Sequence, residues 1–511
     1  MWVQLYYAEH AESKVLPISR LRSSQLRYDA SLDSTSPPPP PRSLSHRLFL
    51  GLAPIALGLA VAFLVPRPAA IAPAGWRLLG IFVGTISALI LAPIPGGAVV
   101  LMAVTLAAIF GGLTIAQALG GYGDPTVWLV QAAFFISNAL IKTGLARRIA
   151  LLFVRAVGGS SLGVCYALSL TDMVLAPIIP SNGARSGGVV LPIVRSIAEL
   201  YGSQPGPTAA LIGSFLFTGV YQSICITSAM FMTGQASNAL AAQIGNQMFH
   251  VPVTFPLWAL AGIVPGLCSL LVVPWLVARV NPPEIRRTPE ARAFAASELH
   301  RMGSMDRGQK TVLVIFLSVC GLWMTSPLHH LDVAVTALAG AAALLLTGVL
   351  SWDDVIRDHI AWDIFIWYGG LLQLGKAINE AGVTRAFASA VGSWWSTAGW
   401  ISLFVVAIVV FYYAHYGFAS ITAHMLAMLP AFGTLLIAKG APAGLVFFAF
   451  ACAANLSGGL TNYGTTPSPM FFAHGYVSFA RWWKVGFVVS LANIAIWSTV
   501  GVLWWKVIGI W

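Results

Sequence analysis

Four clusters of small polar residues interrupt stretches of sequence that are otherwise apolar. The clusters lie at 180–188, 223–228, 417–424 and 457–469, and all except 223–228 combine serine, threonine or asparagine with glycine or proline. Glycine and proline break helices, and the N–H and C=O groups that they free are tolerated at membrane depth only where they line a cavity or are buried in protein. Such N–H groups at the positive ends of broken helices, together with hydroxyls and amides, suit an anion such as a carboxylate.

The side chains available to such an anion are hydroxyls, asparagine amides, a guanidinium and an imidazole. Arg185 is the only full positive charge near any cluster, whereas a cation would require several carboxylates, and only Asp172 lies close. We expect Asp172 to have a buried partner such as Arg185 or Arg195. For His424, a hydrogen bond to the anion and local packing remain equally open. The predicted binding residues are Ser181, Asn182, Arg185, Thr227, Ser228, Ser420, Thr422, His424, Thr461, Asn462, Thr465 and Thr466.

The composition shows which kind of element must position these clusters. Of the 511 residues, 58% are hydrophobic and 9% are charged, whereas soluble domains contain about 25% charged residues. The net charge is 28 − 17 = +11, but the basic residues lie in short loops and not on one face, so no nucleic-acid partner is expected. The five cysteines show no CxxC spacing, which argues against a zinc site. We therefore predict an all-α, polytopic protein of the lipid bilayer without a prosthetic group.

Apolar stretches near the length of a membrane helix recur about eleven times. They lie at about 48–65, 76–92, 97–112, 126–141, 207–230, 254–278, 311–326, 331–350, 361–378, 442–457 and 485–505. Two further apolar segments, 161–200 and 396–438, are about twice that length. Basic residues concentrate in 142–155 and 279–310, which predicts that both loops are cytoplasmic. These constraints hold together only if 161–200 enters and leaves from the cytoplasm and 396–438 from outside, so both are predicted to be re-entrant hairpins.

The chain is expected to consist of a tail, two repeats and a linker. Residues 1–47 read as a disordered, basic cytoplasmic tail and 281–310 as a cytoplasmic linker, between a first repeat at 48–280 and a second at 311–511. The halves match at one offset, with Gly144 and Gly382 (382 − 144 = 238), Pro192 and Pro430, and Thr227-Ser228 and Thr465-Thr466 as the pairs. Because these pairs fall on opposite sides of the membrane, the pattern is that of the inverted repeats of secondary transporters.

The residues at these clusters resemble a known family. Segments 176–193, 418–424 and 460–469 are similar to the signatures of the divalent anion/sodium symporter family, in particular its citrate carrier and plastid 2-oxoglutarate/malate translocator branch. The resemblance covers roughly residues 48–511. It implies scaffold helices that hold the protein in place, a transport domain that moves elevator fashion, and a homodimer.

The resemblance also implies roles for individual residues. Ser181 and Asn182 would contact a substrate carboxylate from the first hairpin, and Ser420 and Thr422 from the second. In sodium-coupled members the hairpin and the unwound helix also coordinate Na⁺, which here places a candidate coupling ion near Ser181, Asn182 and Ser228.

This sequence departs twice from the family's Ser-Asn-Thr pattern. Gly183 stands in place of the first threonine and Ile421 in place of the second asparagine. The change at Ile421 puts the second sodium site in doubt and favours exchange of one organic anion for another.

The sequence therefore predicts a secondary transporter that exchanges dicarboxylates or tricarboxylates. A sodium-coupled symporter of the same anions is the alternative within transport. A membrane-embedded transferase or hydrolase is the alternative from another class, but no HExxH motif is present. A further alternative is that the small polar residues only let helices pack closely. We expect a bacterial inner membrane, or a chloroplast inner envelope if the tail is cleaved.

Overall fold

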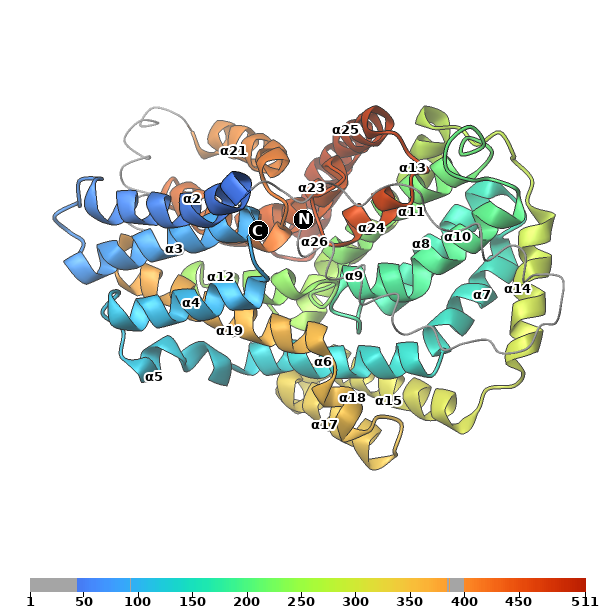
Figure 1. Ribbon diagram of the computed structural model, residues 1–511, viewed down its shortest axis with the longest axis horizontal. Coiled ribbons are helices and arrows are strands. Elements are labelled where there is room, and N and C mark those ends of the chain that lie inside the picture. Colours follow the sequence, from blue (N-terminus) through green and yellow to red (C-terminus); the bar gives the residue numbers. More distant parts are fainter. Residues whose placement is uncertain (1–43, 92, 384–385, 387–398) are drawn as a thin grey trace.

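The computed structural model describes residues 44–91, 93–383, 386 and 399–511, with side chains from residue 50 onward. Most of the predicted tail (1–47) and the start of the predicted second hairpin (396–398) lie outside the described residues, as does Arg385. Within the described part every regular element is a helix, which confirms the all-α prediction (Figure 1). The only β-type pairing there is an isolated bridge between Ser160 and Arg287.

Each of the predicted apolar stretches contains a helix, because a run of apolar side chains with few charges has no other way to satisfy its backbone in lipid. These helices are α2 (Leu44–Phe63), α3 (Pro73–Leu91), α4 (Gly96–Ile109), α6 (Pro125–Lys142), α11 (Gly213–Met230), α13 (Phe255–Val280), α15 (Arg307–Met324), α17 (Val333–Leu346), α19 (His359–Glu380), α23 (Ala443–Ser457) and α25 (Phe479–Ile496). By length and composition, six described helices can cross a membrane, or up to seven if a bent pair is one span. Two of the six are the arms of the predicted second hairpin, so the number of crossings stays a prediction.

The two longer apolar segments are folded back on themselves as helical pairs. The first consists of α8 (Ser161–Leu175), a turn, and an arm of α9 (Asn182–Arg185), the π-helical η3 (Ser186–Val190) and α10 (Leu191–Leu200). The second consists of α21 (Trp400–Ala414), η4 (His415–Gly417) and α22 (Ile421–Ala438). We call 181–184 the first tip and 420–424 the second tip.

The prediction of a helix break at 223–228 is wrong, because α11 runs without interruption to Met230. Its hydroxyl groups donate back into the helix: Ser223 to the Gly219 carbonyl at 3.0 Å, and Ser228 to that of Ile224 at 2.7 Å. Such bonds let serine and threonine stay helical. The break comes one turn later, at 231–235, before α12 (Ala236–Met248). We call 231–235 the first break.

The break predicted in the 457–469 cluster is confirmed. After α23 and the short η5 (Gly458–Leu460), residues 461–466 are not helical, and α24 (Pro467–Ala473) follows. We call 461–466 the second break.

The two halves correspond at some of the predicted pairs and not at others. Gly144 and Gly382, which follow α6 and α19, both have positive φ, at 74° and 78°, a conformation that glycine adopts without strain. Thr227 and Thr465 are not equivalent, because Thr227 lies inside α11 whereas Thr465 lies in the second break.

The arms after the two tips differ by one residue. In the first arm the helix begins at Asn182, and Pro192 follows 192 − 182 = 10 residues later. In the second arm the helix begins at Ile421, and Pro430 follows 430 − 421 = 9 residues later. The first arm contains the π-helical turn η3 in this interval. Because a π-turn adds one residue to a helix, it accounts for the difference.

The segments predicted to share the cytoplasmic side are in direct contact. The amphipathic α7 (Leu145–Val157), bent by 63° from α6, packs against α14 (Pro289–Met302). Arg147 and Glu298 form an ion pair at 2.8 Å between these helices. The two loops therefore lie on one side of the molecule, as the basic residues indicate.

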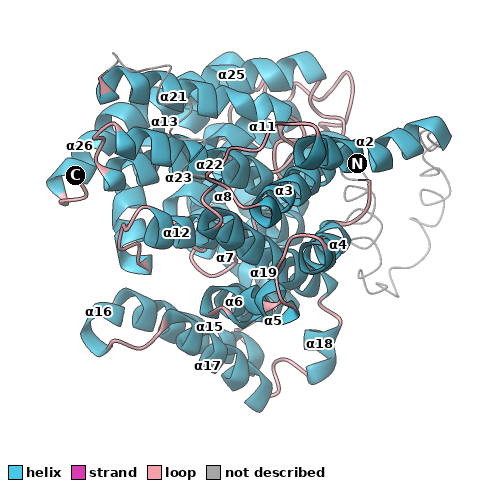
Figure 2. Cartoon of the chain, turned by 90° about the vertical axis from the view of Figure 1, so that its left-hand side faces the viewer, coloured by secondary structure: helices cyan, strands magenta, loops and turns pink. Residues whose placement is uncertain are grey.

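The remaining helices pack in two groups. In the first group α2, α3, α4, α19, α6, α17 and α15 contact one another in succession, and Figure 2 shows α15 and α17 at the lower edge, next to α6. In the second group α8, α13 and α23 contact α11, and α25 contacts α13. The hairpins belong to this group, because α8 and α10 contact α11 whereas α21 and α22 contact α23. A cavity of about 1070 Å³ lies between α3 and α19 on one side and α12 and α22 on the other. None of the predicted binding residues lines it.

The shorter elements connect the helices of these groups. They are α5 (Ile115–Ala118), η2 (Gly120–Gly123), α16 (Ser326–His329), α18 (Trp352–Ile356), η6 (Trp497–Gly501) and α26 (Val502–Val507).

Candidate anion-binding site

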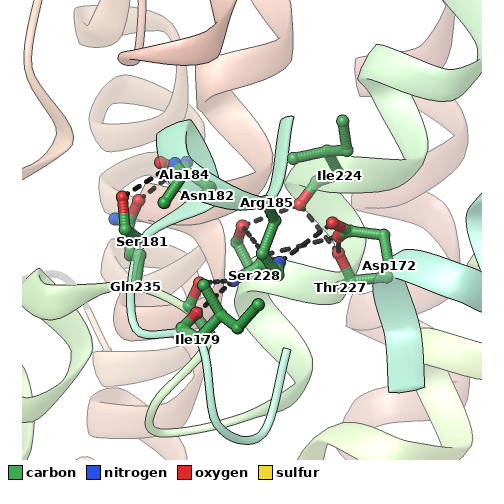
Figure 3. A network of polar contacts seen from close by, with 11 residues as sticks. Asp172, Ile179, Ser181, Asn182, Ala184, Arg185, Ile224, Thr227, Ser228 and Gln235 are labelled. Atoms are coloured by element: carbon green, nitrogen blue, oxygen red, sulfur yellow. Dashed lines mark hydrogen bonds and ion pairs between the residues drawn. The ribbon is translucent and has the colours of Figure 1, made fainter. Parts of the chain in front are cut away.

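The first tip is held by a serine cap and an asparagine amide. The Ser181 hydroxyl accepts a hydrogen bond from the backbone N–H of Ala184 at 3.0 Å, as N-cap residues do at a helix start. The Asn182 side-chain amide donates to Gln235 Oε1 and to Thr465 Oγ1, both at 3.0 Å. Asn182 therefore connects the first tip to both breaks, and Figure 3 shows the contact with Gln235 of the first break.

Behind this tip, Arg185 is fully buried in an ion pair. Its Nε donates to Asp172 Oδ1 at 2.9 Å, and neither side chain is exposed (0% for both). This confirms that Asp172 has a buried partner. The same guanidinium donates to the carbonyls of Ile179 at 2.7 Å and Gly234 at 2.6 Å, and to Ser228 Oγ at 3.2 Å. Arg185 therefore brings no net charge to the first tip, because Asp172 neutralises it.

The predicted residues of α11 belong to this buried network. Thr227 donates its hydroxyl to the Asp172 carboxylate, and Ser228 accepts from Arg185 (Figure 3). Both are completely buried. Thr227 and Ser228 thus support the ion pair, one helical turn before the first break.

The second tip repeats the serine cap but not the asparagine. The Ser420 hydroxyl accepts from the Ala423 N–H at 3.3 Å, and Thr422 is partly buried in the same turn. Ile421, at the position that corresponds to Asn182, is buried. His424, also buried, contacts His415 through their Nδ1 atoms at 3.0 Å.

The second break carries four of the predicted residues, and they differ in exposure. Thr461 is buried and its hydroxyl has no hydrogen-bond partner among the described residues. Asn462 accepts from Trp483 Nε1 at 3.2 Å, and Thr465 is held by Asn182. Thr466 is exposed. Its methyl carbon lies 2.8 Å from the position that a β-carbon on Gly183 would take.

Both tips converge on the second break. The first tip reaches it through Asn182 and Thr465, and the second through His415 Nε2, which lies 2.9 Å from the Gly464 carbonyl oxygen. The structure therefore joins Asn182 to Thr465, and His424 through His415 to Gly464, while Arg185, Thr227 and Ser228 lie behind the first tip. Ser181, Ser420 and Thr422 lie in the two tips, and Thr461, Asn462 and Thr466 in the second break.

Sequence reasoning missed Gln235 and the asparagines that hold the first break. Asn238 donates to the carbonyls of Ser228 at 2.7 Å and Phe231 at 2.9 Å, and accepts from Asn455 at 2.8 Å. The signal that could have found them is Gly234-Gln235, a helix-breaking glycine with an amide three residues before Asn238.

A sodium ion near Ser228 does not fit the groups found there. Sodium requires oxygen ligands, and the oxygens of Ile179, Gly234 and Ser228 already accept hydrogen bonds from the Arg185 guanidinium. A sodium ion there would compete with the guanidinium for these oxygens.

Comparison with known proteins matches the whole helical part of the chain. The model of the sodium:sulfate symporter transmembrane region matches residues 46–511. YflS of Bacillus subtilis, named as a proposed malate transporter, is 42% identical over 461 residues, which cover 90% of this chain and 96% of the relative. Dicarboxylate transporter 1 of Arabidopsis thaliana chloroplasts is 37% identical over 508 residues, with coverages of 97% and 91%. The crystal structure of the Alcanivorax borkumensis YdaH transporter shares the fold, with a TM-score of 0.51, 14% identity and coverages of 92% and 99%.

Proposed function

The chain belongs to the family of the sodium:sulfate symporter transmembrane region, and on that premise we propose that it exchanges dicarboxylates or tricarboxylates across a membrane. The family is one of multi-pass membrane transporters and not of enzymes. The names of two relatives, a proposed malate transporter and a dicarboxylate transporter, support carboxylates as the substrates. A bacterial inner membrane is the proposed location.

The observation that carries this proposal is the convergence of the two tips on the second break. A carboxylate is bound by N–H and O–H donors, and these arrive from three segments far apart in the sequence, around Ser181, Ser420 and 461–466. Asn182 and Thr465 now bind each other. Each would exchange this bond for one to a carboxylate oxygen, so little polar surface is left unsatisfied in either state.

Exchange without sodium is favoured over sodium-coupled symport. Two features support this choice: the guanidinium of Arg185 binds the oxygens around Ser228, and Ile421 replaces the amide that would stand in the second tip. The family's description, which names sodium, favours the alternative. Uptake of malate into vesicles without internal substrate, with and without Na⁺, separates the two, and stimulation by Na⁺ would favour symport.

An elevator-type motion is the proposed mechanism. The first hairpin packs against α11 and the second against α23, which itself contacts α11, so both belong to the second group of helices. A cavity lies between α3 and α19 of the first group and α12 and α22. A second group that moves as one body would carry both tips together, so that their arrangement around the substrate is kept.

Counterflow in reconstituted vesicles tests the proposal. Vesicles loaded with malate, succinate, 2-oxoglutarate, citrate or tartrate should accumulate labelled malate without ATP when the internal anion is a substrate. The Asn182→Ala variant should lose roughly 10- to 100-fold in apparent affinity, since it removes an amide that binds two partners. Gln204→Ala, in the exposed loop between α10 and α11, is the control that also removes an amide, and it should transport normally. Unchanged transport by Asn182→Ala would remove Asn182 from the site, and no counterflow with any of the five anions would refute the proposed function.

A further inference from the structure

Two buried histidines join the second tip to the second break. His415 is the first residue of η4 and His424 lies in the first turn of α22, and their Nδ1 atoms are 3.0 Å apart. His415 Nε2 lies 2.9 Å from the Gly464 carbonyl oxygen. Neither ring is exposed, and the His424 ring lies tilted against that of Phe411, with 4.2 Å between the centroids, and near the Phe411 backbone carbonyl.

The partners of this pair fix where its protons are. The Gly464 carbonyl only accepts, so His415 Nε2 must carry a proton, and in neutral His415 the Nδ1 atom is then an acceptor. His424 Nδ1 must therefore donate to His415 Nδ1. Neutral His424 consequently has its lone pair on Nε2, and this buried atom has no hydrogen-bond partner among the described residues.

The Nε2 atom of His424 is thus a basic nitrogen that can take up a proton without breaking either existing bond. After protonation, His424 Nδ1 still donates to His415 and His415 Nε2 still donates to Gly464. A buried polar atom without a partner is rare in proteins, and one at a functional site calls for an explanation.

A proton at this position is costly as long as the site holds no anion. The titratable side chains of the elements packed against η4 and α22, and of the second break, are Arg77, Tyr412, Tyr413, Tyr416, Cys452 and Tyr463. None of these is a carboxylate. Burial and the positive end of α22 also disfavour a charged imidazole. An anion at the second tip reverses this balance, because Ser420 lies one helical turn from His424.

We propose that His424 Nε2 is a proton-binding site and that one proton is bound together with each carboxylate substrate. This inference rests on the proposed function. The proton comes from the aqueous phase, neutralises one negative charge of the substrate and is released with it. Since coupling is reciprocal, the anion raises the affinity for the proton by the same factor by which the proton raises the affinity for the anion.

The test measures malate binding to the purified chain and its proton uptake. Titration calorimetry at pH 7.5 in buffers with different heats of ionisation gives the number of protons bound per malate, expected to be about one. The dissociation constant for malate should rise about tenfold per pH unit between pH 7 and 8.5. Binding without proton uptake, and with a dissociation constant that is independent of pH, would overturn the proposal on the unmodified chain alone.

Two variants identify the nitrogen. His424→Asn keeps a donor towards His415 but has no basic atom, and we expect malate binding that is weaker at pH 7, independent of pH and without proton uptake. His474→Asn is the matched control, because this partly buried histidine bonds Met470 outside the site. It should keep the proton uptake of the wild type.

Proton uptake that persists in His424→Asn would overturn the assignment to His424. Absence of any malate binding or counterflow by the wild type would overturn the proposed function and this inference with it. A wild type that exchanges malate without taking up protons would overturn this inference alone.

Discussion

The two hairpin tips have the same frame but differ in how completely their polar groups are bonded. Both begin with a serine that caps the following helix through the N–H three residues on. The amide nitrogen of Asn182 in the first tip has two acceptors and the guanidinium behind it is paired, whereas the second tip has Ile421 and, among the described residues, a histidine nitrogen without a partner. We infer that the first tip is a pre-formed support, and that the second tip is where binding of a ligand changes the protonation state.

The largest expected effect comes from opening the ion pair behind the first tip. Asp172→Asn leaves the Arg185 guanidinium buried without a counter-charge, which typically costs about 3–5 kcal/mol. We expect a large loss of thermal stability in detergent and no transport. The control is Glu199→Gln, which opens an exposed i,i+4 pair with Arg195 and should cost below about 0.5 kcal/mol. Equal melting temperatures for the two variants would show that the first tip is not the rigid support described here.

A second prediction compares glycines of the two hairpins. Gly183→Ala places a β-carbon 2.8 Å from the Thr466 methyl group, so the first tip and the second break must separate, at a cost of about 1–3 kcal/mol. Gly417→Ala, before the second tip, meets no atom within 4 Å and should be neutral. Transport by Gly183→Ala should recover in the double variant with Thr466→Ser. If the double variant is no better than the single one, the contact with Thr466 does not set the position of the tip.

The two serine caps should contribute equally to stability, and both should contribute to transport. Ser181→Ala and Ser420→Ala each remove one side-chain acceptor and should cost about 1 kcal/mol in thermal unfolding. Since both serines also face the proposed substrate, the apparent affinity for malate should fall in both. If only one of the two variants lost thermal stability, the two serine caps would not be structurally equivalent.

The smallest effect concerns a surface ion pair that serves as the reference for the buried one. Partial burial raises the pKa of Asp354, but the hydrogen bonds from Lys142 and Ser351 outweigh it and lower the pKa to about 2. The stabilisation is therefore present above the ordinary pKa of 3.8 and is lost as the pH falls towards 2. Lys142→Met should cost less than about 1 kcal/mol at pH 7, because the pair is partly exposed. The difference in melting temperature from the wild type should shrink below pH 4, and a constant difference would exclude the ion pair as its cause.

The sequence predicted the helices well because hydropathy and length determine them, and it predicted the partner of Asp172 because buried charges must be paired. It placed the break of α11 wrongly, since hydroxyls such as those of Ser223 and Ser228 can bond within their own helix. Local composition does not distinguish these two outcomes. The sequence did not predict the π-turn in the first arm either. Its extra residue can be recognised only by comparing the lengths of the two arms, which requires the residue at which each helix begins. The pairing of Asn182 with Gln235 depends on tertiary packing, which no spacing in the sequence reveals.

The neutralised guanidinium of Arg185 has an electrical consequence. A unit charge that crosses a membrane potential of 100 mV gains or loses about 2.3 kcal/mol. Arg185 and Asp172 are in contact at 2.9 Å, so any displacement of the first tip moves both together and the potential does no net work on them. The voltage dependence of a transport cycle would then be set by what the protein carries, and not by the charges of this pair.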